Sequence, residues 1–429
     1  MDMILLLFLL FIVLMFCTVP VGFAMAASAC VALVYGGLPM TVLVQRIAFG
    51  VDSFLLIAAP LFLFAGDLMN TSGVTRRIFR FAESLVGHIP GGLAHVNVLA
   101  SVIFAGMSGS ATADASGLGI MEIKAMEEAG YDTVFSSAIT AASSTISPII
   151  PPSVAMVIYG SIAEVSVGRL FLGGVVPGLL LGAYMIGVNV VLAKRRNYPR
   201  GKRHTIKQMA KNFGNAFFCL MIPFIVMGGI IGGIFTPTEA AAIAVCYSLV
   251  LGLGYRELTL KEFLPAVKRT FLLTANIMFI VGSATLFAWL MARVNAPGFI
   301  LKFFTSVGGG KVLFLVLVNI LVFILGMLLD TIAILLIVVP LFYPLAASLG
   351  VDLVHFGVMI TLNTAIGLIT PPVGMVLFVV TGISKCSIKD LCRELIPYWV
   401  VMIGGLILIC CMPAIVTWLP NIVFGVSTA

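Results

Sequence analysis

Small polar residues that could bind a cation cluster between Met107 and Gly117, inside an otherwise apolar part of the chain. Four of them carry a side-chain oxygen that suits this role: Ser108, Ser110, Thr112 and Asp114. Hydroxyl, carbonyl and carboxylate oxygens are the ligands that small hard cations prefer. The same residue types also occur in flexible hinges and where two helices pack closely. The segment therefore indicates a cation site or a packing motif.

A related segment follows 220 residues later in the chain. When residues 106–177 are placed without gaps on residues 326–397, Ser110 falls on Asp330 and seven positions occupied by glycine, methionine, aspartate or proline are identical. The identities are Gly106 with Gly326, Met107 with Met327, Gly130 with Gly350, Asp132 with Asp352, Pro151-Pro152 with Pro371-Pro372, and Pro177 with Pro397. Glycine, proline and aspartate fix backbone geometry and are scarce in apolar helices, so the pattern predicts an internal duplication. Paired, interrupted apolar segments in two halves of a membrane protein point to a transporter's binding site.

The composition predicts an integral membrane protein. Of 429 residues, 61% are hydrophobic and only 10% are charged. Long uninterrupted apolar runs favour helices over a β-barrel, so the predicted fold class is all-α. We assign the net charge of +7 to loops that set orientation and expect no nucleic-acid partner. The sequence contains no Gly-Lys-Ser/Thr phosphate loop, so we do not expect ATP hydrolysis.

Residues 1–193 are predicted to form the first repeat. Within it, residues 3–36 should form two short helices that break near Thr18–Gly22. Residues 90–128 are predicted to form a re-entrant hairpin with the polar segment at its tip. The run Leu93–Ala105 would be only about 20 Å long as a helix, too short for a hydrocarbon core of about 30 Å. Residues 134–163 predict a discontinuous helix, because prolines remove backbone donors in its middle.

Residues 194–211 contain eight Lys and Arg residues and predict a basic cytoplasmic linker between the halves. The second repeat, residues 212–429, follows the same plan. Its hairpin is predicted at 311–349 with a tip at 326–331, and its broken helix at 354–383. We expect 255–269 to be an amphipathic connector between spans and 398–418 to be the last span.

Each half thus has five predicted crossings besides its hairpin. Because five is odd, the two repeats must have inverted topology. With the N-terminus outside, 19 of the 24 Lys and Arg residues fall in cytoplasmic segments. The positive-inside rule therefore predicts a multi-pass protein with an external N-terminus.

The interrupted segments should meet near the membrane midplane, where free helix N-termini attract anions and unwound carbonyls attract cations. The first predicted Na⁺ site combines the tip and break of the first half: Ser108, Ser110, Thr112, Asp114, Ser143, Ser144, Thr145, Ser147 and Ser153. The second combines those of the second half: Asp330, Thr331, Asn363, Thr364 and Thr370. Ordinary helix–helix hydrogen bonding by hydroxyl groups is the alternative.

Two charged residues leave several roles open. Asp330 could be a direct cation ligand, a proton carrier, or a structural cap of the second hairpin helix. Arg293 ends an apolar span on the outer side. It could contact a carboxylate substrate, or it could be an arginine that reaches the membrane interface.

Four sequence motifs of this chain resemble the large membrane subunit of tripartite ATP-independent periplasmic (TRAP) transporters. They lie at residues 106–115, 146–153, 235–241 and 363–374. The resemblance covers essentially the whole chain. It implies an elevator-type transporter in the bacterial inner membrane, where the N-terminus that the charge distribution places outside would be periplasmic. It also implies import of an organic anion, such as a C4-dicarboxylate or sialic acid, driven by Na⁺ bound at two or more sites.

The resemblance further implies two partner chains, a periplasmic substrate-binding protein and a small four-helix membrane subunit that we expect to be separate. Carried over by motif, Ser108, Ser110, Asp114 and Ser153 would serve the first cation and substrate site. Asp330 would serve the second site, and Arg293 would contact the anion.

Other functions remain open at this point. A partner-independent anion symporter, coupled to Na⁺ or H⁺, would use the same repeats. An intramembrane enzyme could use Asp114 and Asp330 as paired acids, although they lie in different repeats. A passive channel is a further alternative. The duplicated, broken segments favour a secondary transporter over an enzyme or a channel.

Overall fold

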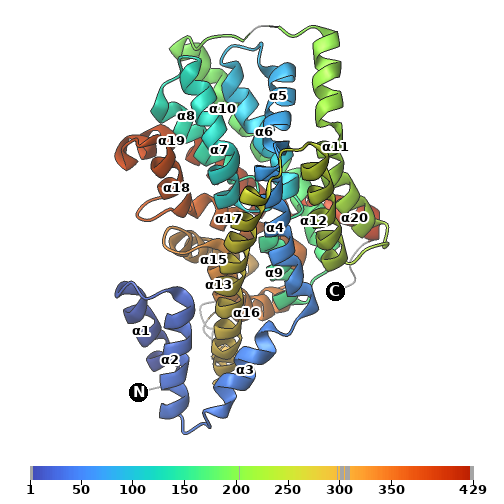
Figure 1. Ribbon diagram of the computed structural model, residues 1–429. Helices are drawn as coiled ribbons and strands as arrows, with labels where there is room; N and C mark the ends of the chain where they lie inside the picture. Colours follow the sequence, from blue (N-terminus) through green and yellow to red (C-terminus); the bar gives the residue numbers. More distant parts are fainter. Residues whose placement is uncertain (1–2, 202, 297, 300–303, 305–309, 426–429) are drawn as a thin grey trace.

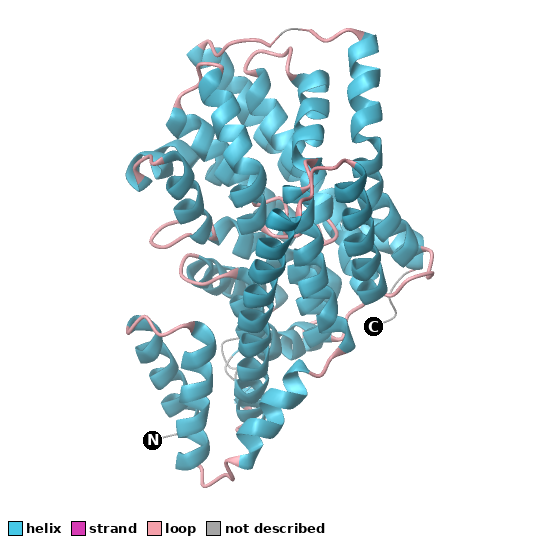
Figure 2. Cartoon of the chain, viewed as in Figure 1, coloured by secondary structure: helices cyan, strands magenta, loops and turns pink. Residues whose placement is uncertain are grey.

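The computed structural model describes residues 3–201, 203–296, 298–299, 304 and 310–425. The regular structure of this part of the chain is helical, as predicted (Figure 2). Seven helical segments among the described residues are long and apolar enough to cross a membrane: Phe54–Thr71, Val167–Arg196, Ile206–Ile231, Pro237–Gly254, Leu260–Arg293, Thr331–Ser348 and Ile388–Cys411. The chain is therefore a multi-pass, all-α membrane protein.

The N-terminal region begins with two short helices, α1 (Met3–Phe16) and α2 (Val21–Tyr35), which lie side by side (Figure 1). They are separated at Cys17–Pro20, which confirms the predicted break. Helix α3 (Thr41–Val51) has no buried residues and runs along α13 (Leu260–Arg293). The chain continues through η1 (Phe54–Ile57), α4 (Ala58–Thr71) and α5 (Val74–Val86).

Three further helices, α11 (Ile206–Ile231), α12 (Pro237–Gly254) and α13, pack against this N-terminal region. Helix α12 contacts α4, α11 contacts α5, and α13 contacts α2, α3 and α4. We call α1–α5 with α11–α13 the scaffold group. In Figure 1, α13 runs as one long helix through the middle of the molecule.

Capping residues explain where the scaffold helices begin. Thr236 and Glu239 form a capping box at the start of α12. Thr205 and Gln208 form another, so α11 starts inside the predicted 194–211 linker. The predicted connector at 255–269 is wrong from residue 260 onward, because a third box at Thr259 starts the 34-residue helix α13 there.

The first hairpin consists of α6 (Gly92–Ser108) and α7 (Ala111–Glu128), and the first broken helix of α8 (Thr133–Ser144) and α9 (Val154–Ala163). Both were predicted. The tip is shorter than expected, because only Gly109 and Ser110 lie between the two hairpin helices. Gly109 adopts a left-handed conformation with φ of 61°, which reverses the chain in two residues. Most of the polar segment is therefore helical. Helix α10 (Val167–Arg196) follows.

The same order of elements occurs again in the second half. The hairpin consists of α15 (Lys311–Gly326) and α16 (Thr331–Ser348), and the broken helix of α17 (Leu353–Gly367) and α18 (Met375–Ser384). Asp132 caps α8 and Asp352 caps α17, at matching positions of the two halves. The last predicted span is instead two helices, α19 (Ile388–Cys411) and α20 (Ala414–Phe424), because Pro413 follows the end of α19. Opposite orientation of the repeats stays a prediction.

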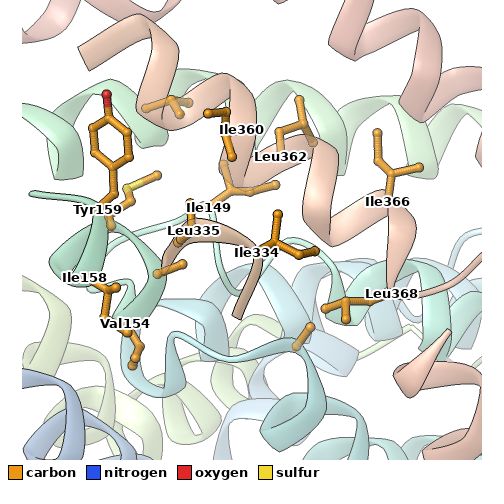
Figure 3. Packing of buried hydrophobic residues seen from close by; sticks show 14 of the residues in the cluster. Ile149, Val154, Ile158, Tyr159, Ile334, Leu335, Ile360, Leu362, Ile366 and Leu368 are labelled. Atoms are coloured by element: carbon orange, nitrogen blue, oxygen red, sulfur yellow. The ribbon is translucent and has the colours of Figure 1, made fainter. Parts of the chain in front are cut away.

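The two halves share one apolar core. Figure 3 shows side chains of α9, α16 and α17, among them Tyr159, Ile334 and Ile360, in one cluster of buried hydrophobic residues. All three side chains are buried. The Tyr159 hydroxyl donates to the carbonyl of Leu353, 2.7 Å away. A Cβ on Gly357 would lie 2.4 Å from the Tyr159 ring, so glycine permits this contact. The first broken helix is thereby packed directly on the second.

Candidate functional site

A cavity of about 510 Å³ lies between the tips of the two hairpins and the scaffold helices α4 and α13. Four of the predicted cation-binding residues line it: Ser110, Thr112, Asp330 and Thr331. The breaks contribute Pro148 and Val154 from the first half and Leu368 and Met375 from the second. The structure thus brings both tips and both breaks to one place, as the sequence predicted.

The first tip presents hydroxyl groups at the N-terminus of α7. The hydroxyls of Ser110 and Thr112 lie 3.2 Å apart and share one hydrogen bond. Ser108 is buried, and its Oγ has no hydrogen-bond partner among the described residues. A Cβ on Gly66 of α4 would lie 3.1 Å from the Cα of Ser108, so the tip packs directly on the scaffold group. An orphaned buried oxygen beside hydroxyl groups fits a cation ligand set.

The first break holds the tip in place. A Cβ on Gly109 would lie 2.5 Å from the carbonyl oxygen of Pro152, so tip and break are in backbone contact. Ser153 caps α9 by accepting from the backbone N–H of Met156 at 3.2 Å, and it donates to the carbonyl of Pro148. Ser153 is fully buried. Its hydrogen bonds account for a structural role; its role in substrate binding stays a prediction.

Asp114 points from α7 toward the first break. Its Oδ2 accepts a hydrogen bond from Ser147 at 2.8 Å, and its Oδ1 is unpaired within the part of the chain that is described. The side chain is buried and is not among the residues that line the cavity. The carboxylate therefore joins hairpin and break, and a role as a cation or substrate ligand stays a prediction.

A buried polar network continues behind Asp114, between α6 and α8. Ser101 donates to Ser143 at 3.1 Å, Ser143 donates to Oδ1 of Asn97 at 2.7 Å, and Asn97 donates to Thr140 at 2.7 Å. Glu122 of α7 lies beside Thr140 and is 1% exposed. Glu122 and Asn97 are not among the site residues predicted from the sequence. Their polar side chains in an otherwise apolar hairpin were the available signal.

The second tip packs on the second break through backbone atoms. The carbonyl of Met327 accepts from the N–H groups of Val373 and Gly374 at 3.2 and 3.1 Å. Asp330 caps α16 through a bond from the N–H of Ile332 at 3.2 Å and also lines the cavity. Its capping role is thus established, and its role as a cation ligand stays a prediction. The Thr331 hydroxyl is buried and has no partner in the described residues.

Asn363 connects the second break to the second hairpin. Its amide donates to the backbone and side-chain carbonyls of Asn319 at 2.9 and 2.7 Å. The Oδ1 of Asn363 is buried and lacks a partner among the residues described. The second half therefore repeats the pattern of the first, with orphaned oxygens beside the tip.

The remaining predicted hydroxyls all donate to their own helix. Ser144 donates to Ala141, Thr145 to Ala142, Thr364 to Thr361 and Thr370 to Ile366. This pattern is ordinary for hydroxyl residues in membrane helices. It also leaves the oxygen lone pairs free, because each hydroxyl has one donor and two acceptor positions. The geometry is therefore compatible with both the cation-site and the packing interpretation.

Arg293 lies at the end of α13, where its guanidinium sits 5.6 Å from the centre of the Trp289 ring. It is not among the residues that line the cavity. Its role as the anion contact stays a prediction. The arginine that does line the cavity is Arg269, which the sequence analysis assigned to a connector. Arg269 pairs with Asp67 of α4 at 2.8 Å.

Comparison with known proteins identifies related sequences over nearly the whole chain. Residues 8–415 match the family described as "Tripartite ATP-independent periplasmic transporter, DctM component". The sialic acid TRAP transporter large permease protein SiaM of Vibrio cholerae serotype O1 is 41% identical over 414 residues, which cover 96% of this chain and 97% of that protein. The C4-dicarboxylate TRAP transporter large permease protein DctM of Pseudomonas aeruginosa is 38% identical over 371 residues, which cover 86% of this chain and 87% of that protein.

A solved structure supports the fold. The YdaH transporter of Alcanivorax borkumensis superposes with a TM-score of 0.66, covering 89% of each chain, at 15% sequence identity. At this identity the likeness concerns the arrangement of the helices alone.

Proposed function

Because the chain belongs to the family of the DctM component of tripartite ATP-independent periplasmic transporters, we propose that it is the membrane-embedded permease subunit of a Na⁺-coupled importer of an organic anion. The substrate is a carboxylate such as a C4-dicarboxylate or sialic acid, as the names of the relatives suggest. A periplasmic substrate-binding protein delivers it, and a small four-helix membrane subunit completes the complex in the bacterial inner membrane.

The observation that carries this proposal is the cavity between the two hairpin tips. A solute in it would touch both repeats and the scaffold group at once. Its volume lies in the range of small-molecule sites, which is about 300–1,000 Å³. The N-terminus of α7, whose N-cap residue Ser110 makes no side-chain capping bond, reaches the cavity, and such termini favour anionic groups.

We place one Na⁺ at each tip. Residues for the first are Ser108, Ser110, Thr112, Ser144 and Thr145, with Asp114 as a further candidate. Residues for the second are Asp330, Thr331, Asn363, Thr364 and Thr370. The support is the orphaned, buried oxygens of Ser108, Thr331 and Asn363. Na⁺ bound beside an incoming carboxylate would offset its charge, so that each ligand raises the affinity for the other.

The packing suggests which parts would move. Hairpins and broken helices pack on one another, and α13 packs on α2, α3 and α4; the two groups meet where α5 contacts α6, α4 contacts α6 and α9, and α13 contacts α16. We propose an elevator motion in which the hairpins and broken helices slide against the scaffold group. The cavity lies at the boundary between the two groups, where such a motion would carry a solute across the membrane.

The first test is the thermal stability of the purified chain against NaCl, with KCl and choline chloride at equal ionic strength as controls. A ligand that binds only the folded state stabilises it by about 2.7 kcal/mol at a hundredfold excess over Kd. We expect saturable stabilisation by Na⁺ alone. In reconstituted complexes, an imposed Na⁺ gradient should drive uptake of succinate or N-acetylneuraminate. Identical responses to Na⁺ and K⁺ would contradict Na⁺ coupling and turn attention to protons.

A further inference from the structure

The charges that line the cavity are unbalanced for an anionic solute. Among its described lining residues, Asp67 and Asp330 are acidic and Arg269 is the one basic residue. An incoming carboxylate would therefore face two fixed negative charges. Bound Na⁺ would offset part of this repulsion. The proposed Na⁺ sites lie on the hairpins, however, whereas Asp67 belongs to the scaffold group. Arg269 is the group on the scaffold side that can attract a carboxylate.

The geometry of Arg269 leaves it free to bind a second carboxylate. Its Nε and Nη2 donate to Oδ2 and Oδ1 of Asp67 at 3.0 and 2.8 Å, so Asp67 occupies one edge of the guanidinium. A guanidinium has five N–H groups in a fixed fork. The edge formed by Nη1 and the second N–H of Nη2 can bind another carboxylate with two hydrogen bonds. The Arg269 side chain is 53% exposed and that of Asp67 only 22%.

Three neutral polar residues accompany Arg269 in a cavity wall that is otherwise largely apolar. Asn70 lies one helical turn after Asp67 on α4, and Thr270 and Asn276 lie on α13; all three line the cavity. They supply hydrogen-bond donors without adding charge. On the opposite side of the same cavity lie Ser110, Thr112 and Asp330 of the two tips. A carboxylate held by Arg269 would thus lie across the cavity from the proposed Na⁺ sites.

We propose that Arg269 is the carboxylate-binding residue of the scaffold side of the cavity, and that Asp67 holds its guanidinium in position. The proposal rests on the proposed function, since it assumes that the solute is an organic carboxylate. It assigns the anion contact to Arg269 in place of Arg293, which stacks on Trp289 outside the cavity lining. Asp67 is a positioning residue, because it acts through Arg269.

The experiment uses the complex with its small subunit and binding protein, reconstituted in vesicles, with succinate and N-acetylneuraminate as probes. The variants are Arg269→Gln, Arg269→Lys, Asp67→Asn and Arg293→Gln. Lys268→Gln is the matched control, because Lys268 is the neighbouring exposed cation on α13 and does not line the cavity. Two quantities are measured for each variant: the anion concentration for half-maximal Na⁺-driven uptake, and thermal stabilisation by NaCl without anion.

We expect Arg269→Gln to raise the half-saturating anion concentration roughly ten- to hundredfold, because a charged hydrogen bond is lost. Stabilisation by NaCl should persist. Arg269→Lys should recover little, since an ammonium can pair with Asp67 but cannot bind two carboxylates through two edges. Asp67→Asn should have a smaller effect of the same sign, and Lys268→Gln should behave as the wild type.

Several outcomes would overturn the assignment. If Arg269→Lys restores wild-type uptake, the ion pair serves only to join α4 and α13. If Arg269→Gln leaves the half-saturating concentration unchanged, or if Arg293→Gln raises it instead, Arg269 does not contact the anion. A wild-type complex that imports neither probe and is not stabilised by NaCl would contradict the proposed function itself, which separates the two failures.

Discussion

Asn363 donates from its side-chain amide to the side-chain carbonyl of Asn319, 2.7 Å away, and so joins the second broken helix to the second hairpin. Ser143, which matches Asn363 in the ungapped superposition of the halves, donates to the side-chain carbonyl of Asn97 at 2.7 Å. In each half, an asparagine on the first hairpin helix accepts a bond from the same position of the broken helix. Hairpin and broken helix are therefore tied together as one unit in both repeats.

The first prediction concerns these asparagines. Replacing Asn319 by Ala removes the side-chain acceptor of Asn363, and replacing Asn97 by Ala removes that of Ser143; each donor keeps a backbone carbonyl as its second acceptor. A hydrogen bond contributes about 0.5–1.5 kcal/mol, so each variant should lower the free energy of unfolding by about that amount for each bond that it removes. Denaturant unfolding of the purified chain measures it. Asn215→Ala, at an exposed position of α11, is the control and should change little. Equal effects at all three positions would contradict the prediction.

The second prediction separates the two roles of Asp330. Asparagine caps helices about as well as aspartate, whereas alanine costs about 1 kcal/mol at this position. Asp330→Asn should therefore keep the stability of the chain without Na⁺, and Asp330→Ala should lower it. If the charge of Asp330 serves a Na⁺ site, both variants should raise the Na⁺ concentration for half-maximal stabilisation by about tenfold or more.

Thermal unfolding across a NaCl series measures both effects of the Asp330 variants. Asp52→Asn, an exposed aspartate at the end of α3, is the matched control. An unchanged Na⁺ response in Asp330→Asn would leave Asp330 with the capping role that its bond to Ile332 already supports.

The third prediction concerns the contact between the second tip and the second break. A Cβ on Gly367 would lie 2.5 Å from the Cα of Gly326, closer than real Cβ contacts allow. Gly367→Ala must therefore push the tip away from the break, at a cost of about 1–3 kcal/mol for overpacking. Gly382→Ala in α18 is the control. A Cβ there meets nothing within 4 Å, so alanine should be neutral or stabilising. Equal stability of the two variants would contradict the prediction, because it would show that the tip can move away from the break without a cost in free energy.

Much of the fold could be predicted, because the residues that interrupt or begin its helices act through neighbouring backbone groups. The prolines at 148, 151 and 152 and at 371 and 372 cannot continue a helix, so both broken helices were placed within a few residues of their ends. Asp132 and Asp352 start the helices after each hairpin for an equally local reason, since a side-chain oxygen satisfies free N–H groups. The duplication then showed that both sets of interruptions belong together.

The pairing of Asp67 with Arg269 could not be predicted. The two residues are 202 positions apart in the sequence, and they meet only because α13 packs against α4. No local sequence pattern indicates which two helices will pack together in this way. The same holds for Asp114: its place in the first turn of α7 was readable, but whether it faces the cavity or Ser147 depends on how the hairpin lies against the break. The sequence placed the two tips near each other, and only the structure supplied the scaffold wall of the cavity.

The last prediction tests what Asp114 does. Its carboxylate is buried and accepts from Ser147 at 2.8 Å, across the contact between hairpin and break. If this bond is its main role, a double-mutant cycle of Asp114→Asn and Ser147→Ala should show a coupling energy of about 1–2 kcal/mol. Ser147→Ala alone should be the more damaging change, because it leaves a buried carboxylate with one donor fewer, whereas asparagine carries no charge.

The control cycle pairs Ser147→Ala with Ser116→Ala, an exposed hydroxyl on α7 that donates to its own helix, and should show no coupling. The Na⁺ response of the same variants distinguishes the two roles. If Asp114 is also a cation ligand, Asp114→Asn should weaken stabilisation by Na⁺ more than Ser147→Ala does. If both variants respond to Na⁺ as the wild type does, Asp114 joins the hairpin to the break, and the first cation site consists of the hydroxyls and carbonyls around Ser108.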